Sequence, residues 1–191
     1  MSPAPPTPPR LPKLERDALD PQQQVVWDRI AGGARGGVGG PFVPLLTSAE
    51  LCSRVEKLGV FIRYDCGVPM RLRELAILVV ATHWQADYEW FAHAPIAAAQ
   101  GVPDEAIQAI GHGQDPALDA APDRAVHAFV AELLRTGRVA DAAYAPVQAL
   151  LGDQGTVELT ALVGYYSLLA MQLNVFQVRP PPTVPIPWAI R

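Results

Sequence analysis

An unbroken apolar run from Leu75 to Ala81 is the feature that most constrains how this chain can fold. A segment without a polar face has to be covered by other elements on every side. Its β-branched residues would suit a buried strand as well as a buried helix. We predict a helix over residues 71–82, because the surrounding segments have helical periodicity and no partner strand is apparent in the sequence.

Helix signals recur along the rest of the chain. Asp20 before Pro21 is typical of a helix start, and Gly152 is placed to end a helix. Apolar residues recur at helical spacing in residues 48–64, 88–100, 123–135, 141–151 and 156–175. The sequence therefore predicts an all-α fold of about eight helices.

Glycine and proline mark the irregular parts of the chain. Residues 32–41 are mostly glycine and cannot form regular structure. We interpret them as a flexible loop rather than a phosphate cradle, because no strand precedes them and the Gly-Lys-Ser/Thr ending is absent. We expect residues 1–19 to be a Pro-rich arm, residues 20–178 a single all-α domain and residues 179–191 a Pro-rich tail.

Composition excludes several classes of function. Half of the 191 residues are hydrophobic and 18% are charged, a composition typical of a globular protein. The net charge is −4, so the chain lacks the positive charge that binding to nucleic acid or to an anionic membrane requires. No apolar run is long enough to cross a bilayer, and the N-terminus does not read as a signal peptide. We therefore expect a cytoplasmic protein with a small-molecule substrate and no nucleic-acid or membrane partner.

Several groups that can transfer protons lie between Glu74 and His93. Glu89 and His93 are four residues apart, so they share one face of a helix. A lone carboxylate such as Glu74 on an apolar segment costs free energy unless it is paired or used. We expect His93 to be the main acid or base, Glu89 to orient it, Glu74 to face it from the preceding helix, and Tyr88 to donate a hydrogen bond to an oxyanion.

Structural roles for these residues remain open at this point. His93 could be bonded inside the core, Glu89 could form a surface ion pair, and Glu74 could pair with Arg71 or Arg73. Arg suits the bidentate binding of a carboxylate. The residues that we expect to bind or enclose a substrate are Arg63, Tyr64, His83, Trp90 and Asn174. No metal site is expected, because paired His-x-x-x-His or His-x-x-Glu motifs are absent.

Several short motifs, taken in their order along the chain, give it a resemblance to a known family. They are Glu74-Leu-Ala-Ile-Leu, Tyr88-Glu-Trp with His93, Ala97-Ala-Ala-Gln-Gly-Val-Pro-Asp-Glu-Ala-Ile, and Gly164-Tyr-Tyr. Over roughly residues 40–178 the chain resembles the cysteine-less, stand-alone members of the carboxymuconolactone decarboxylase family, in the superfamily of the alkyl hydroperoxidase D proteins. The resemblance implies an all-α fold, assembly as a homotrimer or homohexamer, no metal or organic cofactor, and small lactone carboxylic acids as substrates.

The same alignment argues against the peroxidase branch of that superfamily. Hydroperoxidase members carry Glu followed by Cys-x-x-Cys-x-x-x-His, and aligning on Glu74 and His93 places Ala86 and Glu89 at the two cysteine positions. Without two thiols, thiol–disulfide cycling cannot run there. We therefore expect a cofactor-free lyase-like enzyme that decarboxylates, isomerises or hydrolyses its substrate. The alternative is a non-catalytic oligomer that binds a small acid or acts as a scaffold.

Overall fold

The structure, a computed structural model, describes residues 8–12 and 14–188. Within these residues all regular structure is helical, and the all-α prediction is confirmed. The elements in chain order are η1 (Arg16–Ala18), α1 (Pro21–Gly32), α2 (Phe42–Leu45), α3 (Ala49–Val60), the π-helical turn η2 (Phe61–Asp65), α4 (Met70–Trp84), α5 (Asp87–Ala99), α6 (Asp104–Gly111), α7 (Ala121–Thr136) and α8 (Asp141–Phe176).

Helix α4 is the centre of the fold, and α5, α6, α7 and α8 all pack against it. Every residue from Leu72 to Ala81 is buried, so the apolar run is a helix enclosed on all sides, as predicted. The helix ends at Gln85, whose left-handed backbone turns the chain directly into α5. The two helices form a hairpin, and this hairpin places Glu74 opposite His93, in the middle of α5.

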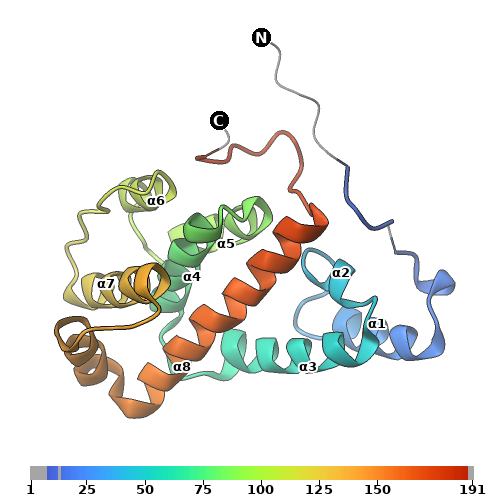
Figure 1. Cartoon of the computed structure of the whole chain (residues 1–191), viewed down its shortest axis with the longest axis horizontal. Coiled ribbons are helices and arrows are strands. Elements are labelled where there is room, and N and C mark those ends of the chain that lie inside the picture. Colours follow the sequence, from blue (N-terminus) through green and yellow to red (C-terminus); the bar gives the residue numbers. More distant parts are fainter. Residues whose placement is uncertain (1–7, 13, 189–191) are drawn as a thin grey trace, which may run out of the picture.

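Helix α8 crosses the molecule between the α4–α5 hairpin and the group formed by α1, α2 and α3 (Figure 1). Gly152 interrupts it with a non-helical backbone (φ +68°), which agrees with the predicted helix end at that residue. Helix α8 is also long and apolar enough to cross a membrane. Only 44% of its most apolar window is buried inside the fold, yet the buried face is continuous with the core, as in the core helices of soluble proteins.

Helix α3 is shorter than the predicted helix over residues 48–64. It ends at Val60, and the chain continues as the wider π-helical turn η2. Single π-helical turns are rare and occur often at functional sites. Here the turn carries Arg63, and the carbonyl groups of Ile62 and Arg63 accept hydrogen bonds from the guanidinium of Arg73.

The C-terminal segment that follows α8 folds back and packs against the helices of its own chain. The Trp188 ring meets Trp90 edge to face, and its indole N–H donates to Asp87 at 2.7 Å. Arg179 also forms an ion pair with Asp87. The segment therefore lies against the start of α5. Of the predicted N-terminal arm, residues 1–7 and 13 lie outside the described residues, and the division into arm, domain and tail stays a prediction.

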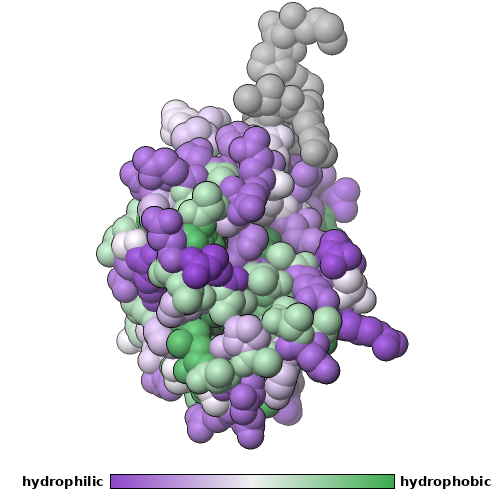
Figure 2. Space-filling view, turned by 90° about the vertical axis from the view of Figure 1, so that its left-hand side faces the viewer, coloured by the Kyte–Doolittle hydropathy of each residue, from purple (hydrophilic) through white to green (hydrophobic). Residues whose placement is uncertain are grey.

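The surface over α7 and the first part of α8 mixes hydrophobic with polar side chains (Figure 2). Tyr144 and Leu150 on α8 are both more than a third exposed there. Exposed apolar residues also follow the second part of α8, at Val157, Met171 and Val175. Scattered exposed apolar residues are ordinary on the surface of a folded protein.

Candidate functional site

A buried pair of side chains links the two helices of the hairpin. Nδ1 of His93 on α5 lies 2.7 Å from Oε2 of Glu74 on α4, and the two residues are 5% and 3% exposed. With Glu74 ionised, Nδ1–H donates to the carboxylate and Nε2 is left as a free acceptor. The Tyr166 ring meets the imidazole edge to face, with centroids 5.1 Å apart. The pair therefore fixes the orientation of His93 and, with Glu74 ionised, favours the tautomer that carries its proton on Nδ1.

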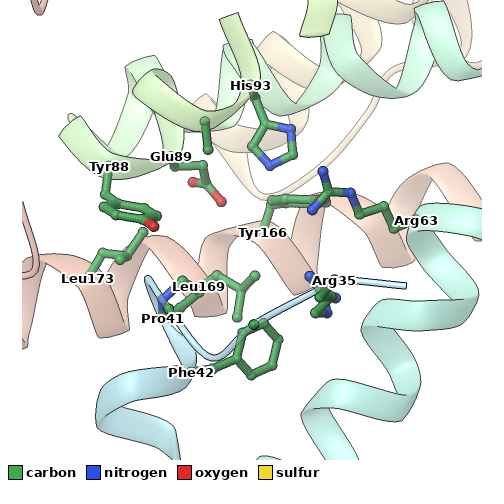
Figure 3. A pocket seen from close by; sticks show the side chains of 13 residues that line it. Arg35, Pro41, Phe42, Arg63, Tyr88, Glu89, His93, Tyr166, Leu169 and Leu173 are labelled. Atoms are coloured by element: carbon green, nitrogen blue, oxygen red, sulfur yellow. The ribbon is translucent and has the colours of Figure 1, made fainter. Parts of the chain in front are cut away.

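His93 forms part of the wall of a small pocket of about 190 Å³. Pockets for drug-sized ligands are usually about 300–1,000 Å³, so this one suits a smaller molecule. Helices α5 and α8, the loop before α2, and Arg63 surround it (Figure 3). The lining residues are Arg35, Gly37, Gly39, Pro41, Phe42, Arg63, Tyr88, Glu89, Ala92, His93, Tyr166, Leu169 and Leu173.

Glu89 is a buried carboxyl group without a hydrogen-bond partner. It is 3% exposed, and neither of its oxygen atoms is bonded within the described part of the chain. Figure 3 shows the carboxyl pointing from α5 into the pocket. Burial raises the pKa of Glu89 well above its usual value and so favours the neutral acid over the carboxylate. The expected role of Glu89 in orienting His93 is corrected: Glu74 holds the imidazole, and Glu89 faces the pocket.

Two arginine side chains face the pocket opposite Tyr88 and Glu89 (Figure 3). They are Arg63, on η2, and Arg35, on the glycine-rich loop. Neither forms an ion pair with an acidic group of the described residues. The arginines that sequence analysis considered as partners of Glu74 bind elsewhere: Arg71 pairs with Asp123, and Arg73 bonds to backbone carbonyls. The pocket thus has unneutralised positive charge on one side and a buried, unpaired carboxyl group on the other.

Tyr88 lines the pocket, as expected of a donor, and its ring packs on Gly40. Four other expected residues are corrected, because none of them lines this pocket. Trp90 is buried against Trp188, and Tyr64 reaches the carbonyl of Ala34 at 3.5 Å. Trp90 follows the pocket-lining residue Glu89, and Tyr64 follows the pocket-lining residue Arg63. Consecutive residues of a helix project in different directions, so these two side chains point away from the pocket.

His83 and Asn174 also lie outside the pocket. His83 is exposed in a separate groove that also contains His127, on the far side of α4 from Glu74. The amide of Asn174 donates to the carbonyl of Trp84 at 2.7 Å, in the last turn of α4. The amide thus donates to a carbonyl group that the end of α4 leaves without a partner in the helix, and it does not face a ligand.

Sequence reasoning did not assign Arg35, Phe42 or Tyr166 to the site. Tyr166 belongs to the Gly164-Tyr-Tyr motif, which carried the family resemblance but was given no role. Burial raises the pKa of its phenol, so it stays a neutral donor. Arg35 is the only charged residue in the glycine-rich stretch 32–41, and that isolation was the available signal.

The two cysteines are free, buried and absent from the pocket lining. Burial raises the pKa of the Cys52 thiol to about 11, which disfavours the reactive thiolate. The Cys66 thiol donates to the carbonyl of Ile62. Among the described residues, no group of three or more His, Cys, Asp or Glu side chains is arranged to hold a metal ion.

Comparison with known proteins identifies the fold. No protein-family profile and no curated protein sequence matches the chain. An uncharacterized peroxidase-related protein from Silicibacter sp. TM1040 superposes with a TM-score of 0.71 at 15% identity, covering 95% of both chains. A second such protein, the alkylhydroperoxidase AhpD core from Ralstonia eutropha JMP134, has a TM-score of 0.73 at 17% identity, covering 91% of this chain and 93% of that one.

A third solved structure is a debrominase. A cysteine-to-alanine variant of Bmp8, in complex with 2,3,4-tribromopyrrole, superposes with a TM-score of 0.70 at 15% identity, covering 91% of each chain. At these identities the likeness concerns the backbone alone. The chain therefore has the fold of the alkylhydroperoxidase AhpD core.

Proposed function

We propose that this protein is a cofactor-free acid–base enzyme that acts on a small carboxylic acid or lactone, in the manner of the carboxymuconolactone decarboxylase family. The observation that carries the proposal is the buried Glu74–His93 pair, whose imidazole borders a pocket sized for a small molecule. The debrominase and the peroxidase-related proteins among the fold neighbours support an enzyme acting on small molecules.

The geometry suits proton transfer to and from carbon. Nε2 of His93 takes a proton from the substrate, and Glu74 stabilises the imidazolium that forms. The electron pair released at carbon moves onto a conjugated oxygen, which the neutral donors Glu89 and Tyr166 can hydrogen-bond. In an isomerisation His93 returns the same proton to a different carbon. Arg63 fixes the carboxylate of the substrate.

Decarboxylation of an unsaturated acid would use the same groups in another order. The bond to the carboxylate carbon breaks, carbon dioxide leaves, and the electron pair again moves onto the conjugated oxygen. Neutral Glu89 then gives a proton to carbon and is reprotonated from solvent. A thiol-based peroxidase reaction is disfavoured, since neither Cys52 nor Cys66 lines the pocket.

The first experiment compares wild type with His93→Ala on a panel of small lactones and unsaturated carboxylic acids, with carbon dioxide recorded. We expect kcat to fall by about 10²–10⁴-fold, the range of a lost general acid–base group, and the bell-shaped pH profile to disappear. His83→Ala is the matched control, because that imidazole lies in another groove. It should keep full activity.

Two results would contradict the proposal. The first is full activity of His93→Ala. The second is that wild type turns over none of the compounds while His93→Ala lowers the melting temperature. That second result would favour the non-catalytic alternative, in which the protein only binds a small acid.

We further propose a homotrimer or homohexamer, as the family resemblance implies. The exposed apolar residues Val157, Met171 and Val175 support a contact through α8. Native mass spectrometry of wild type and Met171→Glu tests this: we expect the wild-type assembly to weaken in the variant. A monomeric wild type would contradict the proposal.

A further inference from the structure

We infer that Arg35, on the glycine-rich loop, acts with Arg63 as an anion clamp, so that the pocket selects a carboxylate over its uncharged analogue. This inference rests on the proposed function, which takes the pocket to be the substrate-binding site. It concerns which molecules bind there, and it can be tested without any turnover.

The guanidinium of Arg35 is held in place yet left without an acidic partner. Its central carbon lies 4.5 Å from the centre of the Phe42 ring, and Nη2 lies 3.5 Å from the hydroxyl of Tyr165. Its Nε atom is buried with no hydrogen-bond partner in the described residues. Unsatisfied buried polar atoms are rare in folded proteins, so an orphan donor beside a pocket points to a ligand.

The neighbouring helix leaves space for this arginine. An added Cβ at Gly59 on α3 would lie 2.0 Å from the hydroxyl oxygen of Tyr165 and 2.6 Å from Nη2 of Arg35. Glycine at this position therefore lets both side chains pack closely against α3.

Arg35 and Arg63 lie on the same side of the pocket (Figure 3). Two cations on one side of a pocket, without an acidic partner among the described residues, repel each other unless an anion lies between them. A carboxylate fits, because each guanidinium offers it a fork of N–H donors.

The rest of the pocket determines how such a ligand lies. Leu169 and Leu173 form an apolar wall on α8, and the unpaired carboxyl of Glu89 lies across from the arginines. Gly37 and Gly39 line the pocket without side chains, which leaves room beside Arg35. The glycine-rich loop is thus a recognition element whose anion contact comes from a side chain, unlike a phosphate cradle, which uses backbone N–H groups.

The test measures binding of sodium crotonate and of neutral crotonamide, two molecules of nearly equal shape, by ligand-observed NMR titration. Wild type should prefer crotonate. Arg35→Gln should weaken crotonate binding about tenfold or more, the loss expected for a charge-assisted hydrogen bond, and leave crotonamide within about twofold. Arg35→Lys should fall between the two, because it keeps the charge but loses the fork.

Arg54→Gln is the matched control: Arg54 is an exposed arginine on α3 that pairs with Glu50, and the variant should bind both compounds as wild type does. Equal binding of crotonate and crotonamide by wild type would overturn the inference. So would an Arg35→Gln variant that loses both compounds equally, since that result means a structural role. Loss of turnover in His93→Ala with crotonate preference intact would separate this inference from the proposed chemistry.

Discussion

The two walls of the pocket are built in different ways. One wall is the α4–α5 hairpin, with regular helices, buried residues and a carboxylate–imidazole pair sealed inside. The other is irregular, formed by the glycine-rich loop with Arg35 and by the π-helical turn with Arg63. The difference suggests a division of labour. Groups that move protons need fixed geometry, whereas groups that recognise charge can be carried on backbone that adapts.

The largest effect within this comparison should come from the helical wall. Glu74→Gln removes the charge behind His93 and leaves the helices intact. We expect kcat to fall about 100-fold or more, because an imidazolium without its carboxylate is less stable and the ring can adopt the wrong tautomer. Steady-state kinetics on a compound that wild type turns over would measure this.

A control variant separates the effect of Glu74→Gln on kcat from an effect on folding. Glu50→Gln, on the exposed Glu50–Arg54 pair, removes a solvent-exposed carboxylate and should change the free energy of unfolding by less than about 0.5 kcal/mol. A Glu74→Gln protein with wild-type kcat would end the assignment of chemistry to the helical wall.

A second prediction concerns the unpaired carboxyl on that wall. The folded-state pKa of Glu89 is raised, so its contribution to stability is complete below the unfolded pKa, near 4.5, and is lost as pH rises toward the folded pKa. Glu89→Gln is always neutral and lacks this loss. The free energy of unfolding of wild type should fall relative to the variant by up to about 1.4 kcal/mol per pH unit in that window.

Urea unfolding at half-unit steps from pH 5 to pH 8 would measure the difference, in which the other titrating groups cancel. Two parallel curves would mean that Glu89 has an ordinary pKa. It could not then serve as a neutral donor in the pocket.

The smallest effects should come from the glycine loop. Gly40 has φ +55°, and an added Cβ would lie 2.5 Å from the Tyr88 ring. Gly36 has φ +69° with nothing within 4 Å. Replacing either with Ala should cost about 1 kcal/mol in backbone strain. Only Gly40→Ala should also displace Tyr88 and raise KM a few-fold, with kcat little changed.

Melting curves and steady-state kinetics on both variants would test the pair. Equal KM values would show that the loop does not shape the pocket through Tyr88. A fall in kcat with unchanged KM would instead place the loop among the elements that control the chemistry, and the contrast between the two walls would fail.

Much of the fold could be predicted because its signals are local. The apolar run 75–81, the Asp20–Pro21 helix start and the break at Gly152 each depend on a few neighbouring residues, and all three are present in the structure. The pairing of Glu74 with His93 could be predicted from the sequence for a related reason. A short turn joins α4 and α5, so the two residues lie on adjacent antiparallel helices.

The rest of the site could not be predicted from the sequence, because it depends on how each helix is rotated about its axis and on contacts between residues far apart in the chain. Four-residue spacing places Glu89 and His93 on one face, but it does not say that Glu74 will occupy the Nδ1 side and leave Glu89 in the pocket. The same uncertainty misplaced Trp90 and His83, which lie on helices of the site but on faces turned elsewhere.

The sequence by itself determined the helical elements, their main breaks and the pairing of an acid with an imidazole across the hairpin, since those follow from periodicity, capping and chain proximity. Only the tertiary structure decided that Arg35 and Tyr166, 131 positions apart in the chain, meet at one pocket. That meeting depends on how α8 packs between the hairpin and α3. Such packing is set by the summed burial of many side chains, and no local pattern contains it.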